Sequence, residues 1–196
     1  MAFDHFEKTG GKIVVELGTT HSFVHGGHPG CDKDDIGYWH PHTPVDWDWG
    51  AGCFTLMAAE WLAHLQPQIF TIDNDASAIR RCQIMTKGYD AVLHHRTTSE
   101  QFLKTFPQKI DLLYLDTGYM NPIEHTARLQ LREAKIIVER DLLTDNGLLL
   151  IDDVRNQNVI GDASGLGKSK YAIPYLLENG FEIVADEYQV ILRKKR

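Results

Sequence analysis

The sequence predicts an α/β fold, a Rossmann-like doubly wound sheet within a single domain that spans residues 1–196. Apolar runs of strand length alternate along the chain with segments whose apolar residues recur every three or four positions. The length suits one domain, and no internal repeat or low-complexity linker divides it. Hydrophobic residues make up 43% and charged residues 24% of the chain, which excludes a disordered or fibrous protein.

Three strands and three helices are expected in the first half of the chain. The strands are expected at 13–17, at 69–72 and, more weakly, at 89–93. A helix over 52–65 places on one face Phe54, Met57, Trp61 and Leu65. Asp75 is placed to cap the next helix, which ends at Gly88 and would bury Ile79, Cys82 and Met85. A short helix follows from Ser99 to about Phe106.

The second half of the chain predicts the remaining strands of a mostly parallel sheet. The run at 111–115 is nearly all apolar, as a strand covered on both faces should be. A long helix begins near Pro122 and closes at Asn146-Gly147, with an inner stripe of Ala127, Leu131, Ala134, Val138 and Leu142. A strand at 148–151 and a helix ending at Asn179-Gly180 come next. The runs 181–184 and 189–192 are expected to form an antiparallel hairpin at the sheet edge.

Composition also excludes several partners and compartments. The formal charge is −7, and the only basic run is the tail 193–196, so a nucleic acid is not expected as partner. No apolar run approaches the roughly eighteen residues of a membrane span. The N-terminus lacks a secretory signal, and the three cysteines are odd in number and widely spaced. We therefore expect a cytoplasmic protein without membrane contact, and leave a homodimer open.

A histidine-rich stretch at 20–49 interrupts the pattern directly after the first expected strand. Long loops in compact domains tend to be lids or binding loops, so we interpret this insertion as a candidate substrate lid. Its possible zinc ligands are His25, His28, Cys31, His40 and His42, but no recognised ligand pattern is complete, which favours structural or lid histidines. Its aromatic residues, expected to cover a ligand, are Tyr38, Trp39, Trp47 and Trp49.

Acidic residues recur at the ends of the expected strands. Glu16 lies in the first, Asp73 ends the second, Asp116 ends the fourth, and Asp152 with Asp153 ends the fifth. Carboxylates gathered at one edge require a neutralising partner, because buried like charges are unfavourable. We therefore expect this edge to hold ribose hydroxyls, a cationic ligand or a metal ion.

These strand ends resemble the successive motifs of class I S-adenosylmethionine-dependent methyltransferases. The resemblance covers nearly the whole chain and rests on Val14-Val15-Glu16-Leu17-Gly18-Thr19, Phe70-Thr71-Ile72-Asp73-Asn74-Asp75, Leu113-Tyr114-Leu115-Asp116 and Leu150-Ile151-Asp152-Asp153-Val154. Within the class, the chain is most similar to small-molecule O-methyltransferases of the catechol type. The resemblance implies a seven-stranded sheet, S-adenosylmethionine as cofactor and a small-molecule acceptor methylated at a hydroxyl oxygen.

The resemblance also implies a role for individual residues around the cofactor. Glu16 and Gly18 would lie beside its methionine part, Asp73 would accept the ribose hydroxyls, and Ser99 would contact the adenine. The remaining cofactor positions are Thr19, Asn74, Asp116, and Gly50 with Gly52. The last two are interpreted as the second half of a glycine loop that the insertion splits.

The resemblance further implies a metal site and a catalytic group. In the metal-dependent members, the positions of Asp116, Asp152 and Asp153 hold one divalent ion, although Asp153 stands where Asn is common. Carboxylate oxygens suit Mg²⁺ or a similar cation. The lysine that serves the catechol-type enzymes as base is replaced by Tyr119. Candidate catalytic residues are therefore Asp116, Tyr119 and His125; a base from the insertion, or none, stays open.

Other functions are weighed against this one. A nicotinamide-dependent oxidoreductase on the same fold would also use an acid after the second strand, but the split glycine loop disfavours it. A non-catalytic cofactor- or zinc-binding module is a further alternative. Residues 161–169 suggest a phosphate loop, yet five residues instead of four separate the first glycine from Gly167-Lys168. A loop leading to the last helix is favoured there.

Overall fold

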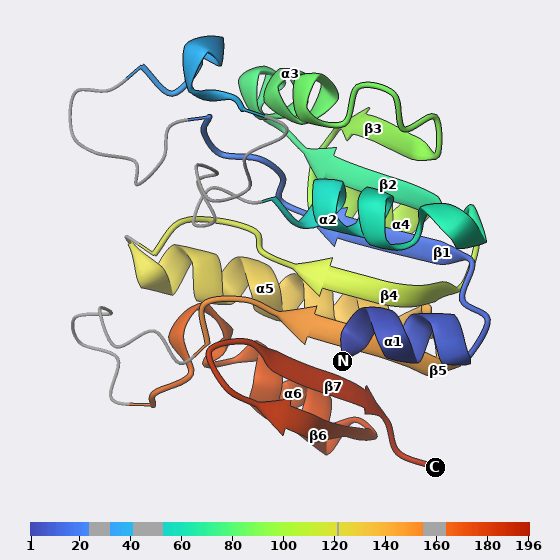
Figure 1. The fold of residues 1–196 in the computed structure, drawn as a ribbon. Helices are drawn as coiled ribbons and strands as arrows, with labels where there is room; N and C mark the ends of the chain where they lie inside the picture. Colours follow the sequence, from blue (N-terminus) through green and yellow to red (C-terminus); the bar gives the residue numbers. More distant parts are fainter. Residues whose placement is uncertain (24–31, 41–52, 121, 155–163) are drawn as a thin grey trace.

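The computed structural model describes residues 1–23, 32–40, 53–120, 122–154 and 164–196, which fold around one seven-stranded sheet. The strand order is β3-β2-β1-β4-β5-β7-β6 (Figure 1). The strands are β1 (Ile13–Leu17), β2 (Gln68–Asp73), β3 (Val92–Arg96), β4 (Ile110–Leu115), β5 (Leu143–Ile151), β6 (Phe181–Asp186) and β7 (Val190–Lys194). The first five are parallel, and β7 is antiparallel to β5 and β6. The expected Rossmann-like fold class is confirmed.

Helices cover both faces of the sheet (Figure 1). One face carries α1 (Ala2–Lys8), α2 (Phe54–Trp61) and α3 (Ala76–Met85). The other carries α4 (Ser99–Thr105), α5 (Ile123–Glu139) and α6 (Ala172–Glu178). Three single turns of 3₁₀-helix are found at Ile36–Tyr38, Ala63–Leu65 and Gly167–Ser169. Within the described residues, no helix combines the length and the apolar character that crossing a membrane requires.

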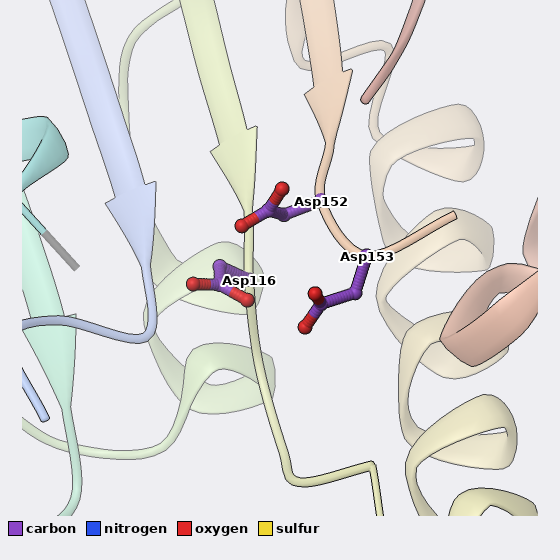
Figure 2. Close-up of side chains that lie close together, drawn as sticks. All are labelled: Asp116, Asp152 and Asp153. Carbon is purple, nitrogen blue, oxygen red and sulfur yellow. The ribbon is translucent and has the colours of Figure 1, made fainter. Parts of the chain in front are cut away.

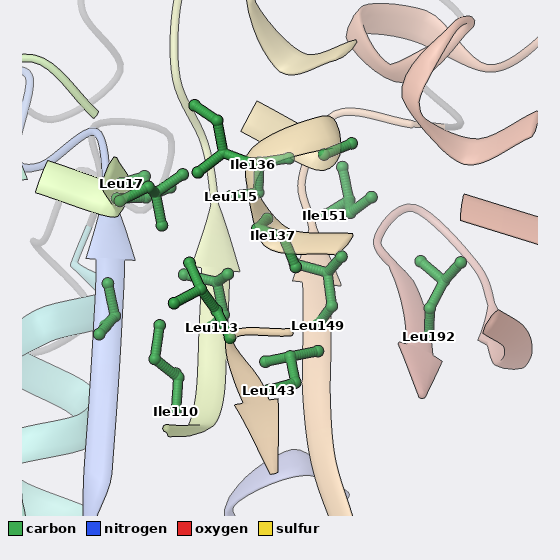
Figure 3. Packing of buried hydrophobic residues seen from close by; sticks show 14 of the residues in the cluster. Leu17, Ile110, Leu113, Leu115, Ile136, Ile137, Leu143, Leu149, Ile151 and Leu192 are labelled. Carbon is green, nitrogen blue, oxygen red and sulfur yellow. The ribbon is translucent and has the colours of Figure 1, made fainter. Parts of the chain in front are cut away.

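Alternate side chains of the central strands pack into two separate hydrophobic cores, one on each face of the sheet. In β1, Val14 packs toward α1 and α2, whereas Val15 and Leu17 pack toward α4 to α6. Leu113 of β4 and Leu149 of β5 continue the second core, which Figure 3 shows closely interdigitated. Because a parallel strand is buried on both faces, its sequence is a continuous apolar run, and this is why the central strands could be located from sequence.

Three element boundaries differ from the sequence expectation. β3 begins at Val92 because residues 86–92 form consecutive turns, in which the Tyr89 N–H donates to the Thr86 carbonyl and the Val92 N–H to the Tyr89 carbonyl. Helix α5 ends at Glu139, and β5 begins already at Leu143. An irregularity in the pairing of β4 with β5 absorbs residues 144–147, so Asn146-Gly147 lies within the strand.

Two further differences concern helices α1 and α2. Trp61, expected inside, is 60% exposed, because the buried face of α2 follows Phe54, Ala58 and Leu62. The Trp61 ring lies 6.4 Å from that of Phe3 in α1, a helix that the sequence analysis did not identify. In α3, by contrast, Asp75 caps the helix by accepting the Ser77 N–H, and Ile79, Cys82 and Met85 are buried as expected.

Candidate functional site

A cavity of about 950 Å³ opens at the carboxyl ends of the parallel strands. This is the edge at which open α/β sheets bind ligands. The expected site residues that line it are Gly18, Thr19, Asp73, Asn74, Ser99, Asp116, Tyr119, His125, Asp152 and Asp153. Residues that lie more than a hundred positions apart in the sequence therefore line one cavity.

Gly18 allows the turn after β1 to pass directly over the end of β4. Its backbone has φ +86°, and a Cβ at this position would lie 2.6 Å from the backbone oxygen of Asp116. A side chain here would therefore force the two strand ends apart. Glycine at this position is needed for close approach between β1 and β4, and Gly18 itself lines the cavity.

Asp73, at the end of β2, is fixed by two backbone donors. The Thr19 N–H donates to Oδ2 at 3.1 Å, and the Asp75 N–H donates to Oδ1 at 2.8 Å. Each carboxylate oxygen can accept a second hydrogen bond. The side chain is thus held in one orientation while it keeps acceptor capacity toward the cavity that it lines.

Glu16 is expected beside the cofactor but is absent from the described residues that line the cavity. Its side chain faces α2 and is only 1% exposed. The hydroxyl groups of Thr55 and Thr71 donate to its carboxylate, the second at 2.6 Å. Burial raises the pKa of Glu16 to about 7. Glu16 therefore joins β1 to α2 and β2 behind the cavity.

Ser99 connects the cavity to a buried glutamate that the sequence analysis missed. The Ser99 hydroxyl donates to Glu133 of α5, and the Thr117 hydroxyl donates to its other oxygen at 2.8 Å. Burial raises the pKa of Glu133 to about 7. The helical spacing of Ala127, Gln130 and Glu133 could have indicated this acid, because all three lie on the buried face of α5.

Asp116, Asp152 and Asp153 form the expected carboxylate cluster. Each offers an oxygen within 4.8 Å of the others, at the ends of β4 and β5 (Figure 2). Asp153 has φ +55°, a left-handed conformation that Asn and Asp tolerate better than most residues. The resemblance to a family with Asn at this position is therefore compatible with the backbone seen here.

Lys168 lies against this cluster, and no step of the sequence analysis placed it there. Its ammonium is 2.6 Å from an oxygen of Asp116 and 2.9 Å from an oxygen of Asp153, and its side chain is 2% exposed. Burial by itself would lower the pKa of Lys168, but the two carboxylates outweigh burial and hold the pKa above its ordinary value. The only hint of this lysine in the sequence was its place in Gly167-Lys168, where a phosphate loop was considered and disfavoured.

Further hydrogen bonds reach the other oxygens of Asp152 and Asp153. Asp152 accepts hydrogen bonds from the Tyr114 hydroxyl at 2.8 Å and from the Gln189 amide at 3.0 Å. The Tyr188 hydroxyl donates to Asp153. Burial raises the pKa of Asp116 to about 7, against the opposing effect of the Lys168 ammonium and with a smaller contribution from Asp152.

The cluster does not fit a divalent ion bound by all three carboxylates while Lys168 keeps its place. Three carboxylates are a suitable donor set for Mg²⁺. The ammonium, however, already occupies oxygens of Asp116 and Asp153, and a second cation between the same groups would meet its charge at close range. An ion would first have to displace a buried side chain.

The candidate catalytic residues at the cavity rim are Tyr119 and His125. Both line the cavity, and Tyr119 is 67% exposed. The ring of Tyr119 lies 5.7 Å from that of His21, edge to face. The first residues of the insertion therefore reach the rim of the cavity.

The structure describes residues 20–23 and 32–40 of the insertion. Arg81 of α3 donates to the Thr20 carbonyl at 3.1 Å and pairs with Asp34 at 2.7 Å, which ties both segments to α3. The Trp39 ring lies 6.4 Å from that of Phe23, and Tyr38 is exposed. The expected residues outside the described part are Gly50, Gly52, His25, His28, Cys31, His42, Trp47 and Trp49.

Comparisons with known proteins give a structural likeness without a sequence match. No family model and no curated protein matches the sequence. An S-adenosylhomocysteine-bound methyltransferase of Podospora anserina, PaMTH1, superposes with a TM-score of 0.62 at 18% identity, covering 100% of this chain and 76% of its own. A proposed O-methyltransferase from Klebsiella pneumoniae gives 0.57 at 11% identity, covering 100% and 78%. An rRNA methylase from Streptococcus thermophilus gives 0.55 at 14% identity, covering 100% and 95%.

These structures are methyltransferases that differ in the kind of acceptor their names imply. At such identities the likeness establishes the fold, which is that of class I methyltransferases and agrees with the resemblance drawn from the strand-end motifs.

Proposed function

We propose that the chain is an S-adenosylmethionine-dependent methyltransferase that acts on a hydroxyl oxygen of a small molecule. The observation that carries the proposal is the cavity at the carboxyl ends of the strands, in which Asp73 is fixed by two backbone donors. The fold shared with an S-adenosylhomocysteine-bound methyltransferase supports the same cofactor.

The residues of the cavity fit the parts of this cofactor. Asp73 can accept both ribose hydroxyls, and such charge-assisted hydrogen bonds are worth about 1.5–3 kcal/mol each. Ser99 lines the same cavity and would contact the adenine. Gly18 packs against the backbone of Asp116, so a methionine part bound beside Gly18 would lie near Asp116, whose carboxylate can attract the sulfonium or amino charge.

The charges around the cavity favour a small acceptor over RNA. Among the described lining residues, the cationic side chains are Arg81, Arg132 and Lys168. Each pairs with a carboxylate, of Asp34, of Glu100, and of Asp116 with Asp153. Phosphate backbones require cations that are free to contact them, and the net charge of −7 opposes their approach.

In the proposed reaction, the acceptor oxygen attacks the methyl carbon in line with the sulfonium leaving group. The carbon–sulfur bond breaks as the carbon–oxygen bond forms, and S-adenosylhomocysteine leaves with the electron pair. The hydroxyl proton passes to a group at the rim, for which Tyr119 and His125 are the candidates, or to water. A divalent ion at the aspartates would orient the oxygen, but it would have to displace Lys168.

The test is transfer of a labelled methyl group from S-adenosylmethionine to a panel of catechols, phenols and aliphatic alcohols, with ribosomal RNA in parallel. We expect labelled product from a small hydroxyl compound and none from RNA. Asp73→Ala is the control, and it should lower the transfer. Labelling of RNA alone would overturn the acceptor class.

The alternatives are tested by ligand-induced thermal shifts, because a ligand that binds only the folded state raises the melting temperature. Stabilisation by NAD but not by S-adenosylhomocysteine would favour the oxidoreductase. Binding of S-adenosylhomocysteine without any transfer would favour a non-catalytic module. The lid role of the insertion, the cytoplasmic location and a homodimer stay predictions.

A further inference from the structure

The position of Lys168 is built by the residues next to it. Gly167 has φ +54°, and a Cβ there would lie 2.2 Å from the carbonyl oxygen of Asp153. Only glycine allows the two backbones to pass so closely. The approach of residue 167 to Asp153 brings the next side chain directly onto the carboxylate cluster.

Ser169, the residue after Lys168, anchors the same turn to helix α5. Ser169 is fully buried and donates to the side chain of Gln130 at 2.5 Å. Gln130 in turn donates to the Thr117 carbonyl, directly after β4, at 3.4 Å. Lys168 is therefore held between the end of β4, the end of β5 and helix α5, and its ammonium is a fixed part of the cavity wall.

We propose that the ammonium of Lys168 takes the place of a divalent metal ion in this cavity, so that methyl transfer needs no metal. The positive charge pairs with Asp116 and Asp153, which are two of the three carboxylates that could hold an ion. It also presents a fixed cation at the cavity surface, where an acceptor oxygen can be oriented.

The first experiment is a titration of the whole protein with Mn²⁺, followed by electron paramagnetic resonance of the free ion. We expect no stoichiometric binding at submillimolar Mn²⁺. Tight 1:1 binding that Asp152→Asn weakens at least tenfold would overturn the proposal, since the wild-type aspartates would then hold an ion despite Lys168.

The second experiment removes the competing charge. Lys168→Met should bind Mn²⁺ at least tenfold more tightly than the wild type, because the three carboxylates lose their internal cation. The matched control is Lys170→Met, which removes a lysine that pairs with Glu124 at 2.8 Å. That variant should bind Mn²⁺ like the wild type. A folded Lys168→Met variant that gains no affinity would contradict the proposal.

A third measurement concerns turnover and rests on the proposed function. Methyl transfer by the wild type should be unchanged in EDTA, and at least a tenfold loss restored by Mg²⁺ would overturn the proposal. The Mn²⁺ titrations need neither cofactor nor acceptor, so they hold if no transfer is found, and the wild-type titration with its Asp152→Asn control holds even if Lys168→Met fails to fold. Binding of S-adenosylhomocysteine, measured on the same samples, tests the proposed function separately.

Discussion

Buried acids are neutralised in two different ways in this molecule. Glu16 and Glu133 receive hydrogen bonds from threonine and serine hydroxyls, and neither lines the cavity. Asp116 and Asp153 line the cavity and share the ammonium of Lys168. A hydroxyl donor tolerates a protonated acid, whereas an ammonium favours the ionised form. At Asp116 the ammonium opposes a burial that raises the pKa to about 7.

The two arrangements suit two tasks. Behind the cavity, neutral donors join β1 to α2 and α4 to α5 without fixing a charge. At the cavity wall, paired charges create a fixed field before any ligand arrives, which is the kind of preorganisation that favours group transfer. Variants of each arrangement should therefore behave differently.

The largest effect is expected from removing the internal cation. Lys168→Met leaves Asp116 and Asp153 without their cation, and breaking ion pairs whose lysine is buried costs about 3–5 kcal/mol of unfolding free energy. Urea unfolding at neutral pH measures it. Lys170→Met, at a more exposed pair, should cost no more than about 1 kcal/mol. Equal losses in the two variants would contradict the special position of Lys168.

The acids that accept hydrogen bonds from hydroxyl groups should make the unfolding free energy depend on pH. Glu133 has a folded pKa of about 7 against an ordinary 4.5. Between these values the unfolded chain has lost a proton that the folded chain keeps, so the unfolding free energy falls as pH rises from about 4.5 to 7 and then levels off. Glu133→Gln should reduce that fall by up to about 3 kcal/mol. Urea unfolding across this range checks it, and an unchanged slope would show that Glu133 is ionised in the fold.

Asp73 is a third case, an acid held by backbone N–H groups alone. Asp73→Ala should weaken S-adenosylhomocysteine binding roughly 100-fold, because about 3 kcal/mol of hydrogen bonds to the ribose is lost. Asp145→Ala, a fully exposed acid at the start of β5, should leave the affinity unchanged in the same calorimetric titration. An Asp73 variant that binds like the wild type would remove the ribose assignment.

The smallest effect is expected at the cavity rim. Tyr119 is exposed, and its hydroxyl stands outside both groups of buried acids. Tyr119→Phe should lower kcat by less than about tenfold, in contrast to the general acid–base groups whose loss costs about 10²–10⁴. Steady-state kinetics on the first acceptor found would measure this, and a loss of a hundredfold or more would identify Tyr119 as the catalytic base.

Sequence reasoning located the central strands because burial on both faces makes them continuously apolar, as in β1 and β4. It placed Asp73, Asp116, Asp152 and Asp153 at one edge because parallel strands end on the same side. It could not find Lys168, because the local sequence around Gly167-Lys168 does not show which distant strand ends this lysine meets. It missed Glu133 for a related reason, since a charged residue on a helix is usually exposed.

The boundaries that failed have local causes. The end of α5 is set by Asp141, which adopts a left-handed conformation at φ +50°, and Asn146-Gly147 is absorbed by an irregular strand pairing. The strand irregularity depends on how β5 pairs with β4, which the sequence of either strand alone does not reveal.

The most direct test of the account is a calorimetric titration of the protein with S-adenosylhomocysteine, with NAD titrated in parallel. The account predicts 1:1 binding of S-adenosylhomocysteine at micromolar concentration, at least tenfold tighter than NAD and weakened roughly 100-fold in Asp73→Ala. No heat of binding at millimolar S-adenosylhomocysteine would contradict it.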